Sequence, residues 1–151
     1  MRDPRLLLAF GFGSGLAKVM PGTCGTLAAV PFYCLMAYLD LTGYLLVILC
    51  TTIVGIYLCA YAAKTMQVHD HPGIVWDEFV GFWITMIAVP FEWEWLCIGF
   101  FLFRFFDMFK PWPISLADKH IHGGFGIMFD DVLAGLAALL CLQGLLATGL
   151  F

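Results

Sequence analysis

Charged side chains are scarce in this 151-residue sequence. They make up 12% of it, whereas hydrophobic residues make up 62%. A soluble domain carries about 25% charged and roughly 45–50% apolar residues, so the composition excludes an ordinary water-soluble fold and favours an integral membrane protein. Basic runs are also absent and the formal net charge is −4, which argues against a nucleic-acid partner.

Paired cysteines are lacking as well. None of the six cysteines forms a Cys-x-x-Cys pair, and five of them lie in apolar stretches, where free cysteine behaves as a small hydrophobic residue. Neither a disulfide framework nor a zinc site is predicted. The N-terminal run shows no signal-peptide cleavage pattern, so we expect it to be retained.

Several apolar stretches are candidates for membrane-spanning helices, which need roughly 17–25 residues to cross the hydrocarbon core. They are residues 27–39, 44–63, 79–91, 93–106 and 132–151. Pro31 is expected to bend the first, and the acidic turn at 92–94 makes the third and fourth a helical hairpin. We predict an all-α, polytopic integral membrane helix bundle of about four to five transmembrane helices. It forms a single domain over 1–151, and residues 6–15 add a short interfacial or re-entrant segment.

The distribution of charge predicts the orientation of these spans. If five spans cross, every Lys and Arg, from Arg2 to Lys119, falls on one side of the membrane. Short basic loops stay in the cytoplasm, so we expect the N-terminus and the loops 64–78 and 107–131 to be cytoplasmic. No charge is predicted near the middle of a span, which argues against an ion channel or a proton relay.

Two six-residue stretches, 73–78 and 126–131, are nearly alike. Each runs from Gly-Ile through an aromatic residue to two acids, and each then enters an apolar helix that contains Gly81 or Gly135. Adjacent carboxylates at the mouth of a membrane helix repel each other and resist desolvation. Mg²⁺ would offset both costs and leave coordination sites for a phosphate. The candidate metal ligands are Asp77, Glu78, Asp130 and Asp131. The alternative is that these acids cap their helices and are otherwise solvated charges.

The segment from Asp107 to Pro113 follows the fourth predicted span. Its two prolines forbid a continuing helix, so Lys110 is expected on a stiff turn at the interface. Arg104 lies close enough to the end of the span to reach the same interface. Both cations are candidates for binding a phosphate, and membrane anchoring is the alternative for each.

A Gly/Thr-rich loop, residues 21–26, precedes the first predicted span, with Lys18 just before it. Its glycines let backbone N–H groups turn toward an anion, and Thr26 is expected to cap a helix beginning at Leu27. We therefore regard Lys18, Thr23 and Thr26 as candidate phosphate-binding residues. The loop lacks the nucleotide-binding P-loop pattern, and such turns are common before helices.

Two His-x-His pairs, at 69–71 and 120–122, lie in predicted loops beside carboxylates. Because that setting is rich in hard oxygen ligands, a transition-metal centre is the less favoured interpretation. A proton-shuttling role for one of these histidines stays open.

Four motifs give the chain a family resemblance: PGTCGT at 21–26, IVWDEFVG at 74–81, DMFKPWP at 107–113 and GGFGIMFDD at 123–131. With these motifs, which span most of residues 10–140, the sequence resembles phosphatidylglycerophosphatase A. The resemblance implies a multi-pass, magnesium-dependent phosphatase of the bacterial inner membrane, active on the cytoplasmic side in glycerophospholipid biosynthesis. It would remove the terminal phosphate of phosphatidylglycerophosphate to give phosphatidylglycerol. The implied catalytic residues are Asp77, Glu78, Asp107, Lys110, Asp130 and Asp131.

The residues themselves favour metal-assisted hydrolysis over a covalent route. The chain has neither the Cys-x₅-Arg pattern of cysteine phosphatases nor an Asp-x-Asp pattern. Lys110, Arg104 and Lys18 would neutralise the transferring phosphate, and Asp107 or a histidine would take the proton of the attacking water. The alternatives left open are a phosphatase of another lipid phosphate, a small multi-span transporter or channel, and a structural scaffold, each in the bilayer and each able to form homo-oligomers.

Overall fold

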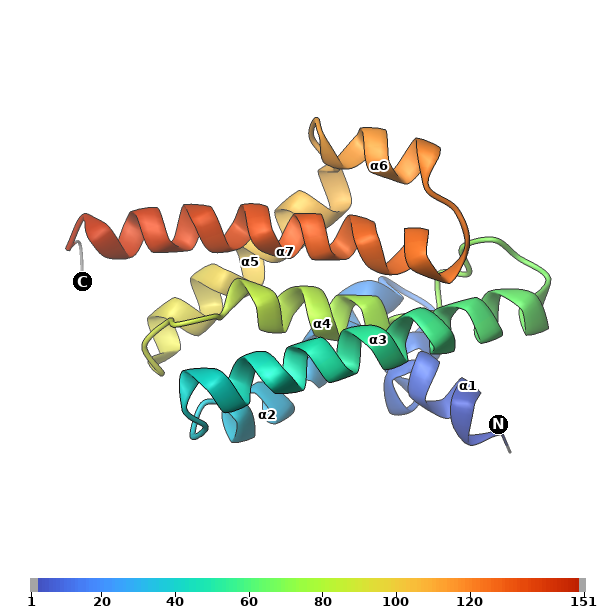
Figure 1. Ribbon diagram of the computed structural model, residues 1–151, viewed down its shortest axis with the longest axis horizontal. Coiled ribbons are helices and arrows are strands. Elements are labelled where there is room, and N and C mark those ends of the chain that lie inside the picture. Colours follow the sequence, from blue (N-terminus) through green and yellow to red (C-terminus); the bar gives the residue numbers. More distant parts are fainter. Residues whose placement is uncertain (1–2, 150–151) are drawn as a thin grey trace.

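The computed structural model describes residues 3–149, so Arg2 and the end of the predicted span 132–151 lie outside the described residues. All regular elements in the described part are helices, which confirms the predicted all-α class (Figure 1). In chain order they are α1 Pro4–Ala9, the 3₁₀ helix η1 Gly11–Leu16, α2 Pro21–Met36, α3 Leu41–Met66, α4 Trp76–Thr85, α5 Trp93–Phe109, α6 Ile114–His120 and α7 Gly123–Ala147.

Helix α4 is the centre of the bundle. The long helices α3 and α7 run lengthwise on either side of it in Figure 1, and α4 also packs against α2 and α5. Every residue of α4 is buried. A helix that is apolar around its whole circumference is stable only when other helices enclose it. Apart from its two first-turn acids, the sequence WDEFVGFWIT is of this kind, which accounts for the central position of α4.

Two helices among the described residues are long and apolar enough to cross a membrane. They are α3 and α7, with mean hydropathies of 2.3 and 2.0 over their most apolar windows. In place of the helix expected over residues 79–91, the structure has the shorter helix α4, which begins at Trp76 and ends at Thr85. The chain that follows contains Ala88 in a left-handed conformation and then Pro90. At about 15 Å, α4 covers only half of a hydrocarbon core. A helix end within the thickness of the hydrocarbon core is tolerated where protein rather than lipid surrounds it, as the other helices surround α4.

The other predicted helices are present with different ends. Helix α2 begins at Pro21 rather than Leu27, because proline is well suited to a first helical position, and it continues through Pro31. Helix α5 begins at Trp93 as predicted but ends at Phe109 rather than Phe106, with Lys110 in a left-handed conformation (φ 42°) before Pro111. Helix α7 begins at Gly123 rather than Val132.

The N-terminal segment packs back onto the bundle. Helices α1 and η1 contact α3 and α2, and the Val75 amide donates a hydrogen bond to the Ala9 carbonyl (3.0 Å) just ahead of α4. A Cβ atom on Gly15 would lie 2.0 Å from the Gly73 carbonyl oxygen, so only glycine permits this approach. Residues 6–15 therefore brace the start of α4 and form no helix long enough to cross a bilayer.

Two glycines set the distance between α4 and α7. A Cβ atom on Gly135 would lie 2.4 Å from the Gly81 carbonyl oxygen, so the two main chains are in direct contact. Gly81 lies four residues after Asp77, and Gly135 lies four residues after Asp131, which puts each glycine on the same helix face as its acid. The contact between the glycines therefore brings together the two acidic pairs of the near-repeat.

We expect Gly135→Val to destabilise the fold by about 1–3 kcal/mol or more, because the added carbons have no space between the two main chains. Thermal unfolding of the detergent-solubilised protein measures this effect. Gly144→Val in the same helix is the matched control, since nothing lies within 4 Å of a Cβ atom at that position. Equal melting temperatures for the two variants would contradict the close-contact interpretation.

Candidate active site

A polar pocket of about 270 Å³ opens where four segments meet: the start of α2, the loop and first turn of α4, the end of α5 and the first half of α7. Its charged lining residues are Asp70, Asp77, Glu78, Arg104, Asp107, Lys110, Asp130 and Asp131. The structure thus brings together all six residues predicted to be catalytic, together with Arg104. Asp70 was not among the predicted site residues.

The two acidic pairs enter this pocket in different ways. Asp77 and Glu78 lie in the first turn of α4, as predicted. Asp130 and Asp131 lie two turns inside α7, because that helix starts at Gly123. The prediction that the second pair lies at a helix mouth is therefore wrong. Neither pair provides a side-chain N-cap, although the first-turn position of Asp77 and Glu78 is one that the helix dipole favours.

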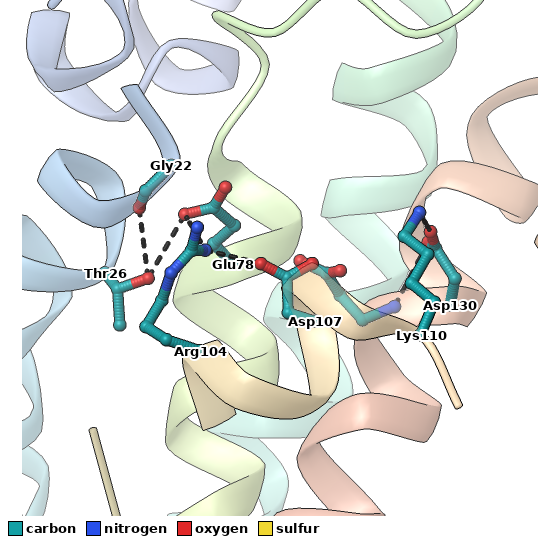
Figure 2. Close-up of polar contacts among 8 residues, drawn as sticks. Gly22, Thr26, Glu78, Arg104, Asp107, Lys110 and Asp130 are labelled. Atoms are coloured by element: carbon teal, nitrogen blue, oxygen red, sulfur yellow. Dashed lines mark hydrogen bonds and ion pairs between the residues drawn. The ribbon is translucent and has the colours of Figure 1, made fainter. Parts of the chain in front are cut away.

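Glu78, Arg104 and Asp107 form a connected ion-pair cluster on one side of the pocket (Figure 2). Arg104 Nη1 lies 3.2 Å from Glu78 Oε2 and donates a hydrogen bond to Asp107 Oδ2 at 2.5 Å. The three side chains are only 12–13% exposed. Arg104 thus bridges the α4 acidic pair to the first residue of the DMFKPWP motif, beyond any role as a membrane anchor.

The start of α2 supports Glu78 directly. Thr26 Oγ1 lies 3.1 Å from both Glu78 Oε2 and the Gly22 carbonyl oxygen, which share its single proton (Figure 2). The prediction that Thr26 caps a helix starting at Leu27 is wrong, because the helix already begins at Pro21. In this structure Thr26 holds a carboxylate.

Gly22 is a site residue that the sequence analysis did not single out. A Cβ atom at this position would lie 2.2 Å from Glu78 Oε1 and 3.0 Å from Arg104 Nη2. Only a glycine lets the first turn of α2 approach the ion-pair cluster so closely. The glycines of the PGTCGT motif point to this position in the sequence. The motif predicts that they turn backbone N–H groups toward an anion, whereas in the structure Gly22 leaves space for the Glu78 side chain.

Lys110 forms the opposite side of the pocket. Its ammonium group donates hydrogen bonds to Asp130 Oδ2 (2.5 Å) and Asp118 Oδ1 (2.9 Å), so it links the α7 acidic pair to α6. Burial alone would lower the pKa of Lys110, but these two carboxylates raise it above its ordinary value. The hydrogen bond from Lys110 lowers the pKa of Asp118. The two carboxylates therefore favour the charged form of Lys110, and Asp118 is the partner of Lys110 that was not among the predicted site residues.

Two carboxylate oxygens in the pocket have no hydrogen-bond partner, although both are buried: Asp77 Oδ1 and Asp131 Oδ2. A buried, unpaired carboxylate oxygen is costly, and a cation would remove that cost. Among residues 3–149, no three His, Cys, Asp or Glu side chains are arranged to hold a metal ion as they stand. Mg²⁺ commonly takes only one or two carboxylates plus waters, so the donor chemistry of the pocket fits this ion.

Three of the predicted phosphate-binding residues, Lys18, Thr23 and Thr26, do not line the pocket. Lys18 is exposed and does not line the pocket, and neither does Thr23, whose hydroxyl is buried without a partner. Of the four histidines, His69 and His122 line a neighbouring cavity of about 430 Å³ that shares Asp70 and Asp130 with the pocket. There His69 accepts a hydrogen bond from the Gly123 amide (3.2 Å).

Comparisons with known proteins identify several relatives of this chain. A protein of Escherichia coli (strain K12) named Phosphatidylglycerophosphatase A is 54% identical over 136 residues, which is 89% of this chain and 79% of that protein. A protein of the same name from Haemophilus influenzae is 46% identical over 140 residues, or 91% and 86% of the two chains. A Bacteroides thetaiotaomicron protein provisionally named a phosphatidylinositol-3-phosphatase is 36% identical over 137 residues, or 86% of each chain. No solved structure matches.

The family profile described as Phosphatidylglycerophosphatase A matches residues 7–146. That range contains all four motifs and every charged residue of the pocket. The chain therefore belongs to the phosphatidylglycerophosphatase A family.

Proposed function

We propose that this protein hydrolyses the terminal phosphate of phosphatidylglycerophosphate to give phosphatidylglycerol, in a magnesium-dependent reaction at the cytoplasmic face of the bacterial inner membrane. The observation that carries the proposal is the pocket itself. It gathers five buried or nearly buried carboxylates and two cations at one end of an apolar bundle, where a lipid headgroup would lie. Relatives named for this activity cover most of the chain.

The cations of the pocket would receive the substrate phosphate. Arg104 and Lys110 are each held by two carboxylates, so both are positioned before any substrate arrives. A phosphate that entered the pocket would compete with those carboxylates for the same N–H donors, and its charge would be stabilised as the transfer proceeds. Cationic groups already fixed in place lose little entropy when the phosphate binds.

The acidic pairs would hold the metal. Asp77, Glu78, Asp130 and Asp131 are the proposed ligands for one or two Mg²⁺ ions, each held by one or two of these carboxylates, and Mg²⁺, when bound, would polarise the phosphoryl oxygens and lower the pKa of the attacking water. The partnerless oxygens of Asp77 and Asp131 support this assignment. Asp107, which belongs to neither pair, is the proposed acceptor of the water's proton.

A transporter is the alternative from another class. Transported substrates and coupling ions are bound near the bilayer midplane between helices. Here eight charged residues line one pocket at the end of the bundle, and α4, which would line a central path, is packed with aromatic side chains. Because one relative carries a phosphoinositide name, a phosphatase of another lipid phosphate is the closer alternative.

The purified protein should release phosphate from phosphatidylglycerophosphate in mixed micelles with Mg²⁺. The assay should include phosphatidic acid, a phosphatidylinositol phosphate and a polyprenyl phosphate at equal surface concentration. We expect the highest kcat/KM for phosphatidylglycerophosphate. A higher value for another lipid would reassign the substrate, and no release from any of them would contradict the phosphatase proposal.

The proposed topology makes a separate prediction. If five segments cross the membrane, a cysteine at Asp118 faces the cytoplasm and one at Glu92 faces the periplasm. In a variant without its native exposed cysteines, a membrane-impermeant maleimide added to intact cells should label position 92 and leave position 118 unlabelled until the cells are lysed. Labelling of position 118 in intact cells would overturn the orientation.

A further inference from the structure

An apolar groove of about 410 Å³ runs between α2 and α5. These two helices scarcely touch each other, since each packs instead on α4, which lies between them. The groove is lined by Leu27, Val30 and Pro31 of α2 and by Trp93, Leu96, Cys97, Phe100 and Phe101 of α5. It contains no charged side chain.

One end of this groove lies close to the polar pocket along both α2 and α5, although the two share no lining residue. On α2, Leu27 directly follows Thr26, which holds Glu78. On α5, Phe100 and Phe101 lie one turn before Arg104, the bridge of the ion-pair cluster. A molecule with its phosphate among these charged groups would therefore have the groove next to it, along α2 and α5.

The dimensions and exposure of the groove suit a hydrocarbon chain. From Phe101 to Trp93 the α5 wall extends about 12 Å along the helix axis, toward the opposite side of the bundle. Leu27, Trp93 and Phe101 are 55%, 74% and 71% exposed, so the walls are open along their length. An open, charge-free groove that starts at a phosphate pocket favours an occupant that is itself part phosphate and part hydrocarbon.

We infer that the α2–α5 groove binds one acyl chain of the lipid whose phosphate occupies the polar pocket, and so makes the site selective for long-chain substrates. The inference rests on the proposed lipid phosphatase function and names the part of the substrate that this groove recognises. Because the surrounding lipid is as apolar as the groove, van der Waals packing along the chain, rather than transfer from water, would supply this selectivity.

A second apolar hollow, of about 480 Å³, lies between α6 and α7 and includes Leu116 and Leu133. One of its walls is the short helix α6, in the loop region 107–131 that is predicted to be cytoplasmic. It therefore lies level with the headgroup rather than beneath the pocket. The α2–α5 groove is the better candidate for a chain that descends into the bilayer.

Cys97 makes the inference testable with one substitution at two positions. Cys97 lies in the groove, whereas Cys141 is an exposed cysteine on α7 outside it. We expect Cys97→Trp to raise KM for dioleoyl phosphatidylglycerophosphate about tenfold, because the indole ring would fill the groove and remove about 1.4 kcal/mol of packing along the chain, with kcat little changed. Hydrolysis of the dihexanoyl analogue should stay within about twofold. Cys141→Trp should alter neither, and Leu27→Trp should reproduce the Cys97→Trp effect from the opposite wall.

A binding measurement separates this inference from the catalytic one. In the Asp77→Asn variant, dioleoyl phosphatidylglycerophosphate should slow alkylation of Cys97 by a maleimide and leave Cys141 unaffected, whereas glycerol phosphate should protect neither. Equal chain-length dependence in the wild type, Cys97→Trp and Leu27→Trp would overturn the groove assignment while phosphate release upheld the enzyme. A change in chain-length dependence in the Leu133→Trp variant alone would also overturn the groove assignment. Protection of Cys97 by phosphate-free lipid to the same degree would show occupancy by bulk lipid only.

Discussion

Removal of Mg²⁺ with EDTA is expected to abolish phosphate release from phosphatidylglycerophosphate. Without a cation, the four paired acids of α4 and α7 face one pocket with only Arg104 and Lys110 to balance them, and two of their oxygens stay unpaired. No group of the chain would then polarise the phosphate and activate the water together. Activity should return when Mg²⁺ is added in excess over the chelator.

The control for chelation is Mn²⁺. This ion also favours oxygen ligands, so partial recovery with Mn²⁺ agrees with the proposed site, and recovery with Zn²⁺ alone would point to the histidines of the neighbouring cavity instead. Full turnover after thorough chelation, with metal content checked by elemental analysis, would contradict the proposal that the acidic pairs act through a metal.

The substitutions Asp77→Asn and Asp130→Asn are each expected to lower kcat at least about a hundredfold, on the order of 2.7 kcal/mol in the barrier. Asparagine keeps the size of the side chain but removes the charge that would bind Mg²⁺. Both residues are nearly buried, at 8% and 5% exposure, so a replacement of the same shape should leave the packing intact. Initial rates with saturating lipid and Mg²⁺ measure the effect.

Asp40→Asn is the matched control, because Asp40 is an exposed carboxylate at the start of α3 with no side-chain hydrogen bond to that helix. It should have near wild-type activity. A raised Mg²⁺ requirement in the Asp77 and Asp130 variants, with unchanged melting temperatures, would identify metal binding as the lost property. Near wild-type rates in both folded variants would instead favour the transporter or scaffold alternatives and leave family membership as a statement of ancestry.

The chemistry of the pocket could be predicted from the sequence more fully than its geometry. Residue type and repetition were enough to select both acidic pairs, Lys110 and Arg104, because few structural roles need so much charge in so apolar a chain. The partners that hold these residues were not predictable. Asp118 is remote from Asp130 along the chain, and Lys110 joins them only because α6 folds back beside α7.

Helix ends were the weakest part of the sequence interpretation. Hydropathy predicted Val132 as the start of the last span, but α7 begins nine residues earlier at Gly123, because glycines that suggest a flexible loop also permit a tightly packed first turn. A Cβ atom on Gly124 would lie 2.2 Å from the Ile56 carbonyl oxygen of α3, a contact that no local pattern reveals. Tertiary packing, rather than intrinsic propensity, decided where this helix begins.

The main-chain contact between Gly81 and Gly135 has a consequence for how the protein responds to heat. Because no side chain separates the two helices at that point, a change of rotamer between them cannot move the backbones of Asp77 and Asp131 apart. These backbones keep their spacing until α4 and α7 separate, and that separation also opens the core around α4. Thermal inactivation should therefore follow the same narrow transition as loss of the folded helix bundle. We expect no folded but inactive intermediate in which α4 and α7 have separated at the acidic pairs.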